Sequence, residues 1–283
     1  MKKLIPYIII LALFLSGCNS KHTIHESIEE IEGNLSVTVL DVGKGDCIIL
    51  RSENAVIMMD TGYIDTSSKV LNYLNRNSID TINYLIITHY DKDHVGGAAK
   101  ILNEINVEQI YLPDYEGVND HYNNMISVIN KKKLSADIVR KDVTFTCDNI
   151  LYKIYATDIE YNGSNNDNDV SLIVSVVNNQ DSFLFTGDIE KAGIKSFLPK
   201  IEMSYDVIKM PHHGRKESNL DKLIEKTDPK IAIITDSQRE HADKKVLDLL
   251  KENGVSTYQS SLNGSYTIIS DGNESLKITE ILE

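Results

Sequence analysis

The stretch THYDKDHVGG, residues 88–97, decides the fold of this chain. It places His89, Asp91, Asp93 and His94 within six consecutive positions, directly after an apolar, strand-like run. In an extended segment, residues i and i+2 point the same way, so His89 and Asp91 can share one metal ion. Asp93 and His94 fall where the chain turns into a helix, so they face a neighbouring point. Because imidazole and carboxylate ligands suit Zn²⁺ or Mn²⁺, the stretch predicts a site for one or two metal ions.

Three further motifs each place a polar side chain at the end of an apolar run. They are DTG at 60–62, TGD at 186–188 and PHHG at 211–214. In α/β folds, ligand sites commonly lie at the carboxyl ends of strands. We expect Asp60 to accept a hydrogen bond from a metal ligand and orient it, Asp188 to bridge two ions, and the pair His212–His213 to supply a further imidazole.

Strand-like and helical runs alternate over 35–283 without a long linker. This alternation predicts a single α/β domain. Within it, the apolar spacing predicts a helix over 95–105, with Asp93 at its N-cap. A disulfide between Cys47 and Cys147 is compatible with an exported protein, but the sequence leaves this pairing open.

The N-terminus is a different kind of segment. A positively charged start precedes a nearly unbroken apolar run over 4–15, which is too short to span a bilayer comfortably. This pattern predicts a secretory signal peptide over 1–17.

The end of that segment predicts a lipid anchor. LSGC at 15–18 resembles the lipobox of bacterial lipoproteins, which implies cleavage before Cys18 and acylation of its thiol. The polar segment 18–34 then tethers the domain to the extracytoplasmic face of the cell membrane. The alternatives are an uncleaved N-terminal anchor, or a plain signal peptide followed by an incidental cysteine.

The composition is that of a folded, acidic protein. Of the 283 residues, 41% are hydrophobic and 25% are charged, as in ordinary soluble domains. The net charge of −13 repels phosphate backbones at long range, which argues against a nucleic-acid binder with a basic groove. It does not exclude a nuclease, because bound metal cations invert the local field.

As an ordered set, these motifs resemble the metallo-β-lactamase superfamily, and within it the ComEC-like metallo-hydrolase domains of competence proteins and their stand-alone relatives. DVGKGD at 41–46 resembles the opening DVGQGD of that group, and NDVSL at 168–172 resembles its N-x-x-S-L stretch. The resemblance covers nearly all of 35–278. It implies an α/β fold in the form of a four-layer αβ/βα sandwich, with a two-metal cleft along one edge.

The resemblance also implies two metal positions, bridged by Asp188. The ligands would be His89 and Asp91 at the first position, and Asp93, His94 and His213 at the second. Either Zn or Mn is expected, as one or two ions, and the abundance of carboxylates favours Mn²⁺ more than a three-histidine site would.

The chain departs from the family pattern at the first position. Asp91 stands where the commoner motif has a histidine. No histidine lies between His121 and His212, so the usual third histidine is missing. Asn168 and Asp169 are the candidates to replace it, and occupancy by a single ion is the alternative.

The expected chemistry is hydrolysis. Two cations about 3.5–4 Å apart lower the pKa of a bridging water and clamp a phosphoryl or carbonyl oxygen. Asp93 would orient this water or accept its proton, and His212 would contact the substrate or the leaving group. His241 lies where the ComEC-like group often has a histidine and is either a phosphate contact or part of a polar surface loop. Asp46 is either a site residue or the end of a turn.

The predicted function is an extracytoplasmic, metal-dependent phosphodiesterase or nuclease, acting on a small-molecule or nucleic-acid phosphodiester. One alternative is another hydrolase on the same fold: a β-lactamase, a lactonase, a thioesterase or a phosphocholine esterase. Asp91 argues against a true zinc β-lactamase, which would keep a histidine there. The other alternative is a non-catalytic lipoprotein that binds at the cell surface. The sequence indicates no protein partner.

Overall fold

The computed structural model describes residues 34–163 and 166–281. The predicted signal peptide 1–17, the predicted lipidation site Cys18 and nearly all of the predicted tether lie outside the described residues. Among the helices of the described part, none is long and apolar enough to cross a membrane.

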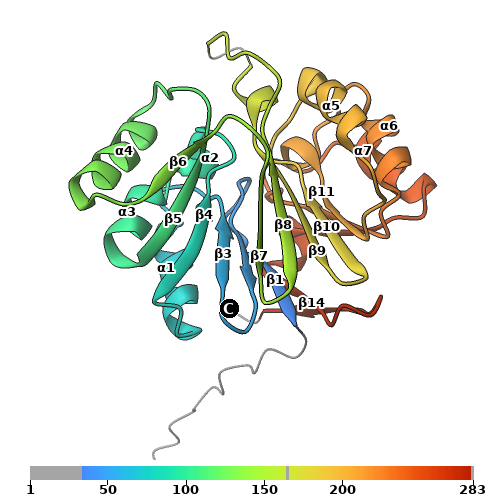
Figure 1. Cartoon of the computed structure of the whole chain (residues 1–283). Coiled ribbons are helices and arrows are strands. Elements are labelled where there is room, and N and C mark those ends of the chain that lie inside the picture. The colour runs from blue at the N-terminus through green and yellow to red at the C-terminus, as the bar shows by residue number, and fades with distance from the viewer. Residues whose placement is uncertain (1–33, 164–165, 282–283) are drawn as a thin grey trace, which may run out of the picture.

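Two β-sheets lie face to face in the middle of the molecule (Figure 1). The first sheet has the strand order β15-β14-β1-β2-β3-β4-β5-β6. Its strands are β1 (Leu35–Val39), β2 (Ile48–Arg51), β3 (Val56–Met59), β4 (Thr81–Ile86), β5 (Asn106–Pro113), β6 (Ala136–Val139), β14 (Tyr266–Ser270) and β15 (Leu276–Glu280).

The second sheet has the order β13-β12-β11-β10-β9-β8-β7. Its strands are β7 (Val143–Cys147), β8 (Ile150–Tyr155), β9 (Ile173–Asn178), β10 (Asp181–Phe185), β11 (Val207–Lys209), β12 (Ile231–Ile234) and β13 (Ser256–Gln259). Each sheet has a parallel part, β3 to β6 in the first and β10 to β13 in the second, whereas its remaining strands pair antiparallel.

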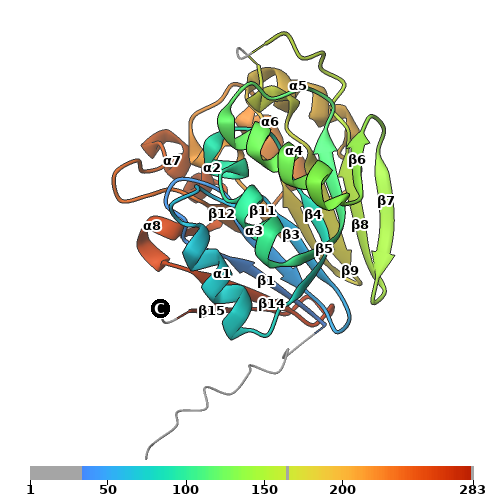
Figure 2. The same ribbon diagram turned by 90° about the vertical axis from the view of Figure 1, so that its left-hand side faces the viewer.

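Helices cover the outer face of each sheet (Figures 1 and 2). The first sheet carries α1 (Ser67–Arg76), α3 (Ala98–Glu104) and α4 (Asp120–Lys132), and the second carries α5 (Lys191–Phe197), α6 (Leu220–Thr227) and α7 (Lys244–Glu252). The shorter elements are α2 (Lys92–Val95), α8 (Ser260–Asn263) and the 3₁₀ turns η1 (Asn168–Val170), η2 (Leu198–Lys200) and η3 (Pro211–Gly214). This arrangement confirms the predicted four-layer αβ/βα sandwich.

Three apolar cores hold the layers together. The central core lies between the sheets and includes Leu50 and Ile57 from the first sheet and Tyr152 and Phe183 from the second. An outer core lies on the other side of each sheet, against its helices. Because both faces of each sheet are covered, the central strands are apolar on both sides, as parallel strands in α/β folds usually are.

The helix predicted over 95–105 is two helices, α2 and α3, which the glycines Gly96 and Gly97 separate. A Cβ on Gly97 would lie 2.6 Å from the carbonyl oxygen of Thr61, so only glycine permits this close approach of the backbones. The prediction that Asp93 caps the helix was wrong, since Asp93 lies inside α2 and the N-cap residue is Asp91.

Candidate metal centre

The predicted motifs meet because they follow strands that end at the same edge of the sandwich. In the first sheet, Asp60 follows β3, and Thr88 and His89 follow β4. In the second sheet, Asp188 follows β10, and η3 with His213 follows β11. Parallel strands present their carboxyl ends at one edge, which is where α/β folds commonly hold ligands.

A tight turn after β11 aims the histidine pair. His212 and His213 have left-handed backbone conformations, with φ of 48° and 54°, and Gly214 follows with φ of 78°. Residues other than glycine rarely adopt this conformation, and the strain it carries is typical of functional sites. A Cβ on Gly214 would lie 2.8 Å from the Cβ of Ala242, so the turn needs glycine there. The turn sends two consecutive imidazoles towards different neighbours.

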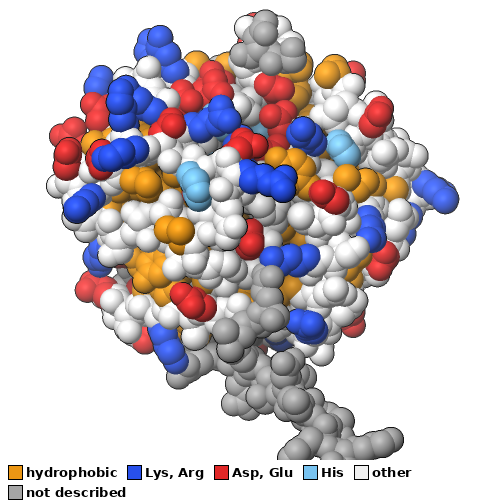
Figure 3. All heavy atoms as spheres, turned by 180° about the vertical axis from the view of Figure 1, so that it is seen from behind, with side chains coloured by type: hydrophobic (Ala, Val, Ile, Leu, Met, Phe, Trp, Pro, Cys, Tyr) orange, Lys and Arg blue, Asp and Glu red, His pale blue; other side chains and the backbone are white. Residues whose placement is uncertain are grey.

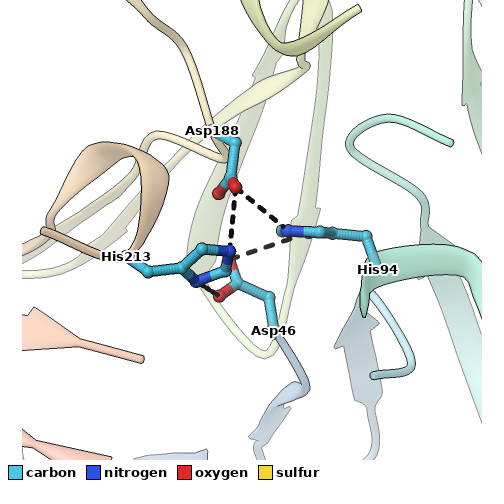
Figure 4. A group of neighbouring side chains, drawn as sticks. All are labelled: Asp46, His94, Asp188 and His213. Carbon is cyan, nitrogen blue, oxygen red and sulfur yellow. Dashed lines mark ion pairs between the residues drawn. The ribbon is translucent and has the colours of Figure 1, made fainter. Parts of the chain in front are cut away.

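One side of the centre gathers groups suited to hold a cation (Figure 4). Asp188 Oδ2 lies 2.9 Å from His213 Nε2 and 3.3 Å from His94 Nε2, and Asp93 Oδ2 lies 3.5 Å from His213 Nε2. Two ligand atoms that share one Zn²⁺ at about 2.1 Å lie roughly 3.0–3.5 Å apart. Nε2 of His94 and of His213 is buried and has no hydrogen-bond partner among the described residues. The donor set therefore fits a divalent cation between Asp93, His94, Asp188 and His213.

Asp46 also belongs to this cluster, but it faces the other side of the imidazoles. One oxygen each of Asp46 and Asp188 lies within 4.8 Å of ring nitrogens of His94 and His213. The ring nitrogens that Asp46 approaches are the Nδ1 atoms, at 3.6 Å for His213 and 4.0 Å for His94. The Asp46 oxygens already accept from Thr235 Oγ1 and contact the ammonium group of Lys209, each at 2.6 Å. The structure thus places Asp46 as the carboxylate that orients the ligands, on the side away from the Nε2 atoms.

Hydrogen bonds fix the orientation of the two histidines in the 88–97 stretch. His94 Nδ1 lies 2.8 Å from Asp60 Oδ2, which also accepts from Thr88 Oγ1 at 2.6 Å. Thr88 Oγ1 in turn lies 3.1 Å from His89 Nδ1. Since the threonine donates its proton to Asp60, its oxygen is free to accept from His89. This arrangement suits rings that are protonated at Nδ1 and have Nε2 available to a metal, and an orienting role of this kind is the one predicted for Asp60.

A matching chain of hydrogen bonds fixes His213. Thr235 Oγ1 donates to Asp46 Oδ1 at 2.6 Å and lies 2.9 Å from His213 Nδ1. Thr235 was not predicted, although it follows the apolar strand β12 as the other site residues follow theirs.

Thr235→Val should weaken Mn²⁺ binding about 10- to 100-fold, because His213 loses the partner that sets its tautomer and angle. Isothermal titration calorimetry measures this change. Thr235→Ser, which keeps the hydroxyl group, should bind Mn²⁺ nearly as tightly as the unmodified chain. Equal affinity in the valine and serine variants would contradict the role given to the hydroxyl group.

The buried charges of the centre shift each other's pKa values. Burial lowers the pKa of His94, but the carboxylates Asp188, Asp60 and Asp46 outweigh burial and raise it well above the ordinary value. Burial likewise opposes a raised pKa at His213, where Asp188 again prevails. Burial raises the pKa of Asp188, but His213, Lys209 and His94 hold it well below its usual range. In the absence of a metal, protons and a cation therefore compete for the same ring nitrogens of His94 and His213.

Metal binding should consequently release protons. Without a metal, the raised pKa values favour the protonated rings of His94 and His213, and Nε2 must lose its proton before it can bind a cation. We expect about one to two protons to leave per ion bound near pH 7, and the affinity to fall as the pH is lowered. Calorimetry in buffers of different ionisation enthalpy counts these protons. An affinity that does not change between about pH 8 and pH 6 would contradict this coupling.

Lys209, the last residue of β11, is a fully buried cation that the sequence analysis did not predict. Its ammonium group lies 2.6 Å from Asp46 Oδ2 and 3.0 Å from Asp188 Oδ1, and donates to the carbonyl oxygen of Gly187. Lys209 therefore contacts both Asp46, which orients the ligands, and Asp188, which was predicted to bridge the ions. The available signal was a lysine within an otherwise apolar strand.

The predicted first metal position has fewer ligands. His89 Nε2 is buried without a hydrogen-bond partner among the described residues, and it lies 3.9 Å from Asp91 Oδ2. The Asp91 side chain is 43% exposed, and burial together with Asp167 and Asp93 raises its pKa to about 6. Of the two ligands predicted for this position, one is therefore a buried imidazole and the other a partly exposed carboxylate.

The candidates for the missing ligand of this position make other contacts. Asn168 Nδ2 donates to Glu190 Oε1 at 3.0 Å. Asp169 Oδ1 accepts from the backbone N–H groups of Glu190 and Gly193, at the start of α5.

The remaining two predicted residues lie apart from the centre. His212 turns towards Glu190 and Glu217, at 3.2 and 3.6 Å. His241 is 57% exposed, and its Nδ1 lies 3.7 Å from Asp236 Oδ2. Its predicted contact with a phosphate stays a prediction.

Three proteins of known name are similar to the chain over most of its length. ComE operon protein 3 of Bacillus subtilis is 24% identical over 253 residues, which are 81% of this chain and 32% of that protein. Competence protein ComA of Neisseria gonorrhoeae is 22% identical over 83% of this chain and 32% of its own length. Recombination protein 2 of Haemophilus influenzae is 26% identical over 70% of this chain and 24% of its own length. The chain thus spans between about a quarter and a third of these relatives.

Solved structures share the fold. The metallo-beta-lactamase fold protein YhfI from Bacillus subtilis is 12% identical, with a TM-score of 0.54, over 82% of this chain and 99% of that one. The E377D mutant of CmlA beta-hydroxylase is 11% identical, with a TM-score of 0.55, over 84% of this chain and 54% of that one. The family model described as Metallo-beta-lactamase superfamily matches residues 40–235, which include every residue of the candidate metal centre. The chain belongs to the metallo-beta-lactamase superfamily, whose members are generally metal-dependent hydrolases.

Proposed function

We propose that the chain is a metal-dependent phosphodiesterase or nuclease that acts on the extracytoplasmic face of the cell membrane, with an acylated Cys18 as its anchor. The observation that carries the hydrolase part is the set of buried Nε2 atoms of His94 and His213, which lack partners among the described residues and face Asp188. The names of the three relatives refer to competence and recombination, which supports a nucleic-acid phosphodiester as the substrate. Asp91, in place of a histidine, supports it against a zinc β-lactamase.

The side chains of the centre would have different roles in such a hydrolysis. Asp93, His94, Asp188 and His213 would hold a divalent cation, which would lower the pKa of a bound water and add positive charge beside the reacting phosphoryl group. Asp93, whose side chain is 13% exposed at the edge of the cluster, would orient the attacking water or accept its proton. Lys209 keeps Asp188 ionised and in place without touching the substrate.

The charge of the surface bears on the size of the substrate. The net charge of −13 disfavours long-range capture of a polynucleotide. The back of the molecule nevertheless carries acidic and basic side chains interspersed (Figure 3). A short or already tethered phosphodiester therefore suits this chain as well as a long nucleic acid does.

A side-by-side assay tests the proposed activity. The chain would be incubated with bis-p-nitrophenyl phosphate, single-stranded DNA, nitrocefin and a lactone, each with Mn²⁺ and with Zn²⁺. We expect hydrolysis of one or both phosphodiesters, with loss of activity after chelation. Hydrolysis of nitrocefin or the lactone alone would overturn the phosphodiester proposal, and no hydrolysis with any metal would favour a binding lipoprotein.

Membrane attachment has a separate test. Cys18→Ser should move the protein from the membrane fraction to the soluble or secreted fraction and abolish labelling by a fatty-acid analogue. Cys147→Ser, at a half-buried free cysteine of β7, is the matched control and should change neither result. Unchanged fractionation and labelling of the Cys18 variant would contradict the lipid anchor.

A further inference from the structure

A second cluster of metal-ligating side chains lies beside the candidate metal centre. It consists of Glu190, which precedes α5, His212 in η3, and Glu217, which precedes α6. One ligand atom from each lies within 4.8 Å of the other two. His212 Nδ1 is 3.2 Å from Glu190 Oε1 and 3.6 Å from Glu217 Oε1, close to the spacing of roughly 3.0–3.5 Å expected for two ligands of one metal ion.

The nearby carboxylates do not provide His212 Nδ1 with a hydrogen bond. It is buried from solvent, yet it has no hydrogen-bond partner among the described residues, although Glu190 is only 3.2 Å away. Asn168, which contacts the same oxygen of Glu190, also has an unpartnered atom. Its Nδ2 donates to Glu190 Oε1, whereas its buried Oδ1 has no partner within the described ranges. Buried polar atoms nearly always have partners, so the Nδ1 atom of His212, beside Glu190 and Glu217, indicates a group that binds there.

The two carboxylates also lack a permanent counterion. The side chain of Glu217 is only 17% exposed and that of Glu190 36%. In residues 34–163 and 166–281, no lysine or arginine forms an ion pair with either carboxylate. The nearby cations Lys44 and Arg215 both pair with Glu240 instead, at 3.4 and 3.5 Å. Charges that are largely buried are usually paired or coordinate a metal.

We propose that Glu190, His212 and Glu217 bind a second divalent cation, outside the candidate metal centre. One imidazole nitrogen and two carboxylates suit Mn²⁺ or Zn²⁺. The site is separate because the rings of His212 and His213 are 6.1 Å apart between centroids and inclined by 65°. His213 faces Asp188 while His212 faces Glu190, so the left-handed turn assigns one histidine to each site.

The proposed second site lies where a bound cation would stabilise the candidate metal centre. Glu190 follows Asp188 by two residues, and His212 directly precedes His213. A cation on Glu190, His212 and Glu217 would therefore join the two segments that carry ligands of the candidate metal centre. It would hold Asp188 and His213 at their distance of 2.9 Å without contacting the substrate itself.

Binding of Mn²⁺ to the purified chain tests this site without depending on activity. Calorimetry and elemental analysis would compare the unmodified chain with Glu217→Gln, Glu190→Gln and Asp188→Asn. We expect each glutamine variant to bind one ion fewer per chain, or to bind it at least about tenfold more weakly. Asp188→Asn should lose binding at the candidate metal centre and keep the ion on Glu217. Glu225→Gln, on the exposed face of α6, is the control and should bind as the unmodified chain does.

The outcomes separate this site from the proposed function. If both glutamine variants bind as many ions as the unmodified chain, with the same affinity, the second site does not exist, whatever the chain hydrolyses. The second site would likewise be ruled out if Asp188→Asn abolished all binding of Mn²⁺. Circular dichroism shows which variants fold, and because Glu190 is more exposed than Glu217, its substitution provides the test if Glu217→Gln unfolds.

Discussion

Asp188→Asn should remove the metal from the candidate metal centre and lower hydrolysis by about 10³-fold or more. The carboxylate lies within 3.3 Å of Nε2 of both His94 and His213, so it is the ligand common to all geometries that fit a cation there. Stabilisation of the transition state by a metal ion is worth several kcal/mol, and each 1.36 kcal/mol corresponds to about tenfold in rate. The amide keeps the shape of the side chain but loses its charge. Metal analysis of the purified variant and initial rates with bis-p-nitrophenyl phosphate would measure the two effects.

The matched control for this substitution is Glu225→Gln, which removes a carboxylate of α6 at an exposed position. It should leave both metal content and rate unchanged. If Asp188→Asn instead retained its metal and more than about a tenth of the rate, the ion would be bound elsewhere and Asp188 would not be a ligand.

Lys209→Met should cause the largest loss of stability. It would leave Asp46 and Asp188, both almost fully buried, without the ammonium group that contacts each of them. Removal of one partner from a buried ion pair costs about 3–5 kcal/mol, and Asp46 loses most here because His213 still lies 2.9 Å from Asp188 Oδ2. Urea unfolding of the metal-free protein, followed by circular dichroism, would measure this change in the free energy of unfolding.

Two comparisons make the result specific. Lys230 pairs with Asp206 at 2.8 Å but is 66% exposed, so Lys230→Met should cost less than about 1 kcal/mol. In the double variant Lys209→Met, Asp46→Asn, the charge of Asp46 that loses its ammonium partner is removed as well. This variant should be less destabilised than the sum of the single changes. Additive effects, or an equal cost at Lys230, would show that Lys209 does not stabilise the centre through these charges.

The sequence predicts the central strands of this fold far better than its edge strands. The apolar runs at 84–88, 171–177 and 206–210 predict central strands, whereas 136–139, 256–259 and 276–280 carry no such run and are β6, β13 and β15, each at the edge of a sheet. An edge strand has a neighbour on one side only, so it keeps polar residues and lacks the continuous apolar run of a central strand. The short helix α6 was missed as well.

In the candidate metal centre, the sequence predicts the ligands better than the residues that orient them. The 88–97 stretch and the strand-end motifs could be found because each combines an apolar run with a polar residue at a fixed place. The partners that orient those ligands come from distant segments, as Asp46 and Thr235 do at a separation of 189 residues. No local pattern joins Asp46, Thr235 and Lys209, because only the packing of the two sheets brings them together. The disulfide that was left open does not form, since Cys47 and Cys147 are both free.

Anomalous diffraction from crystals of the chain grown with Mn²⁺ tests the central claim most directly. The account predicts a manganese peak about 2.1–2.2 Å from Nε2 of His94, Nε2 of His213 and a carboxylate oxygen of Asp188, with Asp93 completing the set. A peak on the Nδ1 side, beside Asp46, would contradict the assignment of the ligands. The absence of any peak at this edge of the sandwich, in crystals grown with excess Mn²⁺, would contradict the metal centre itself.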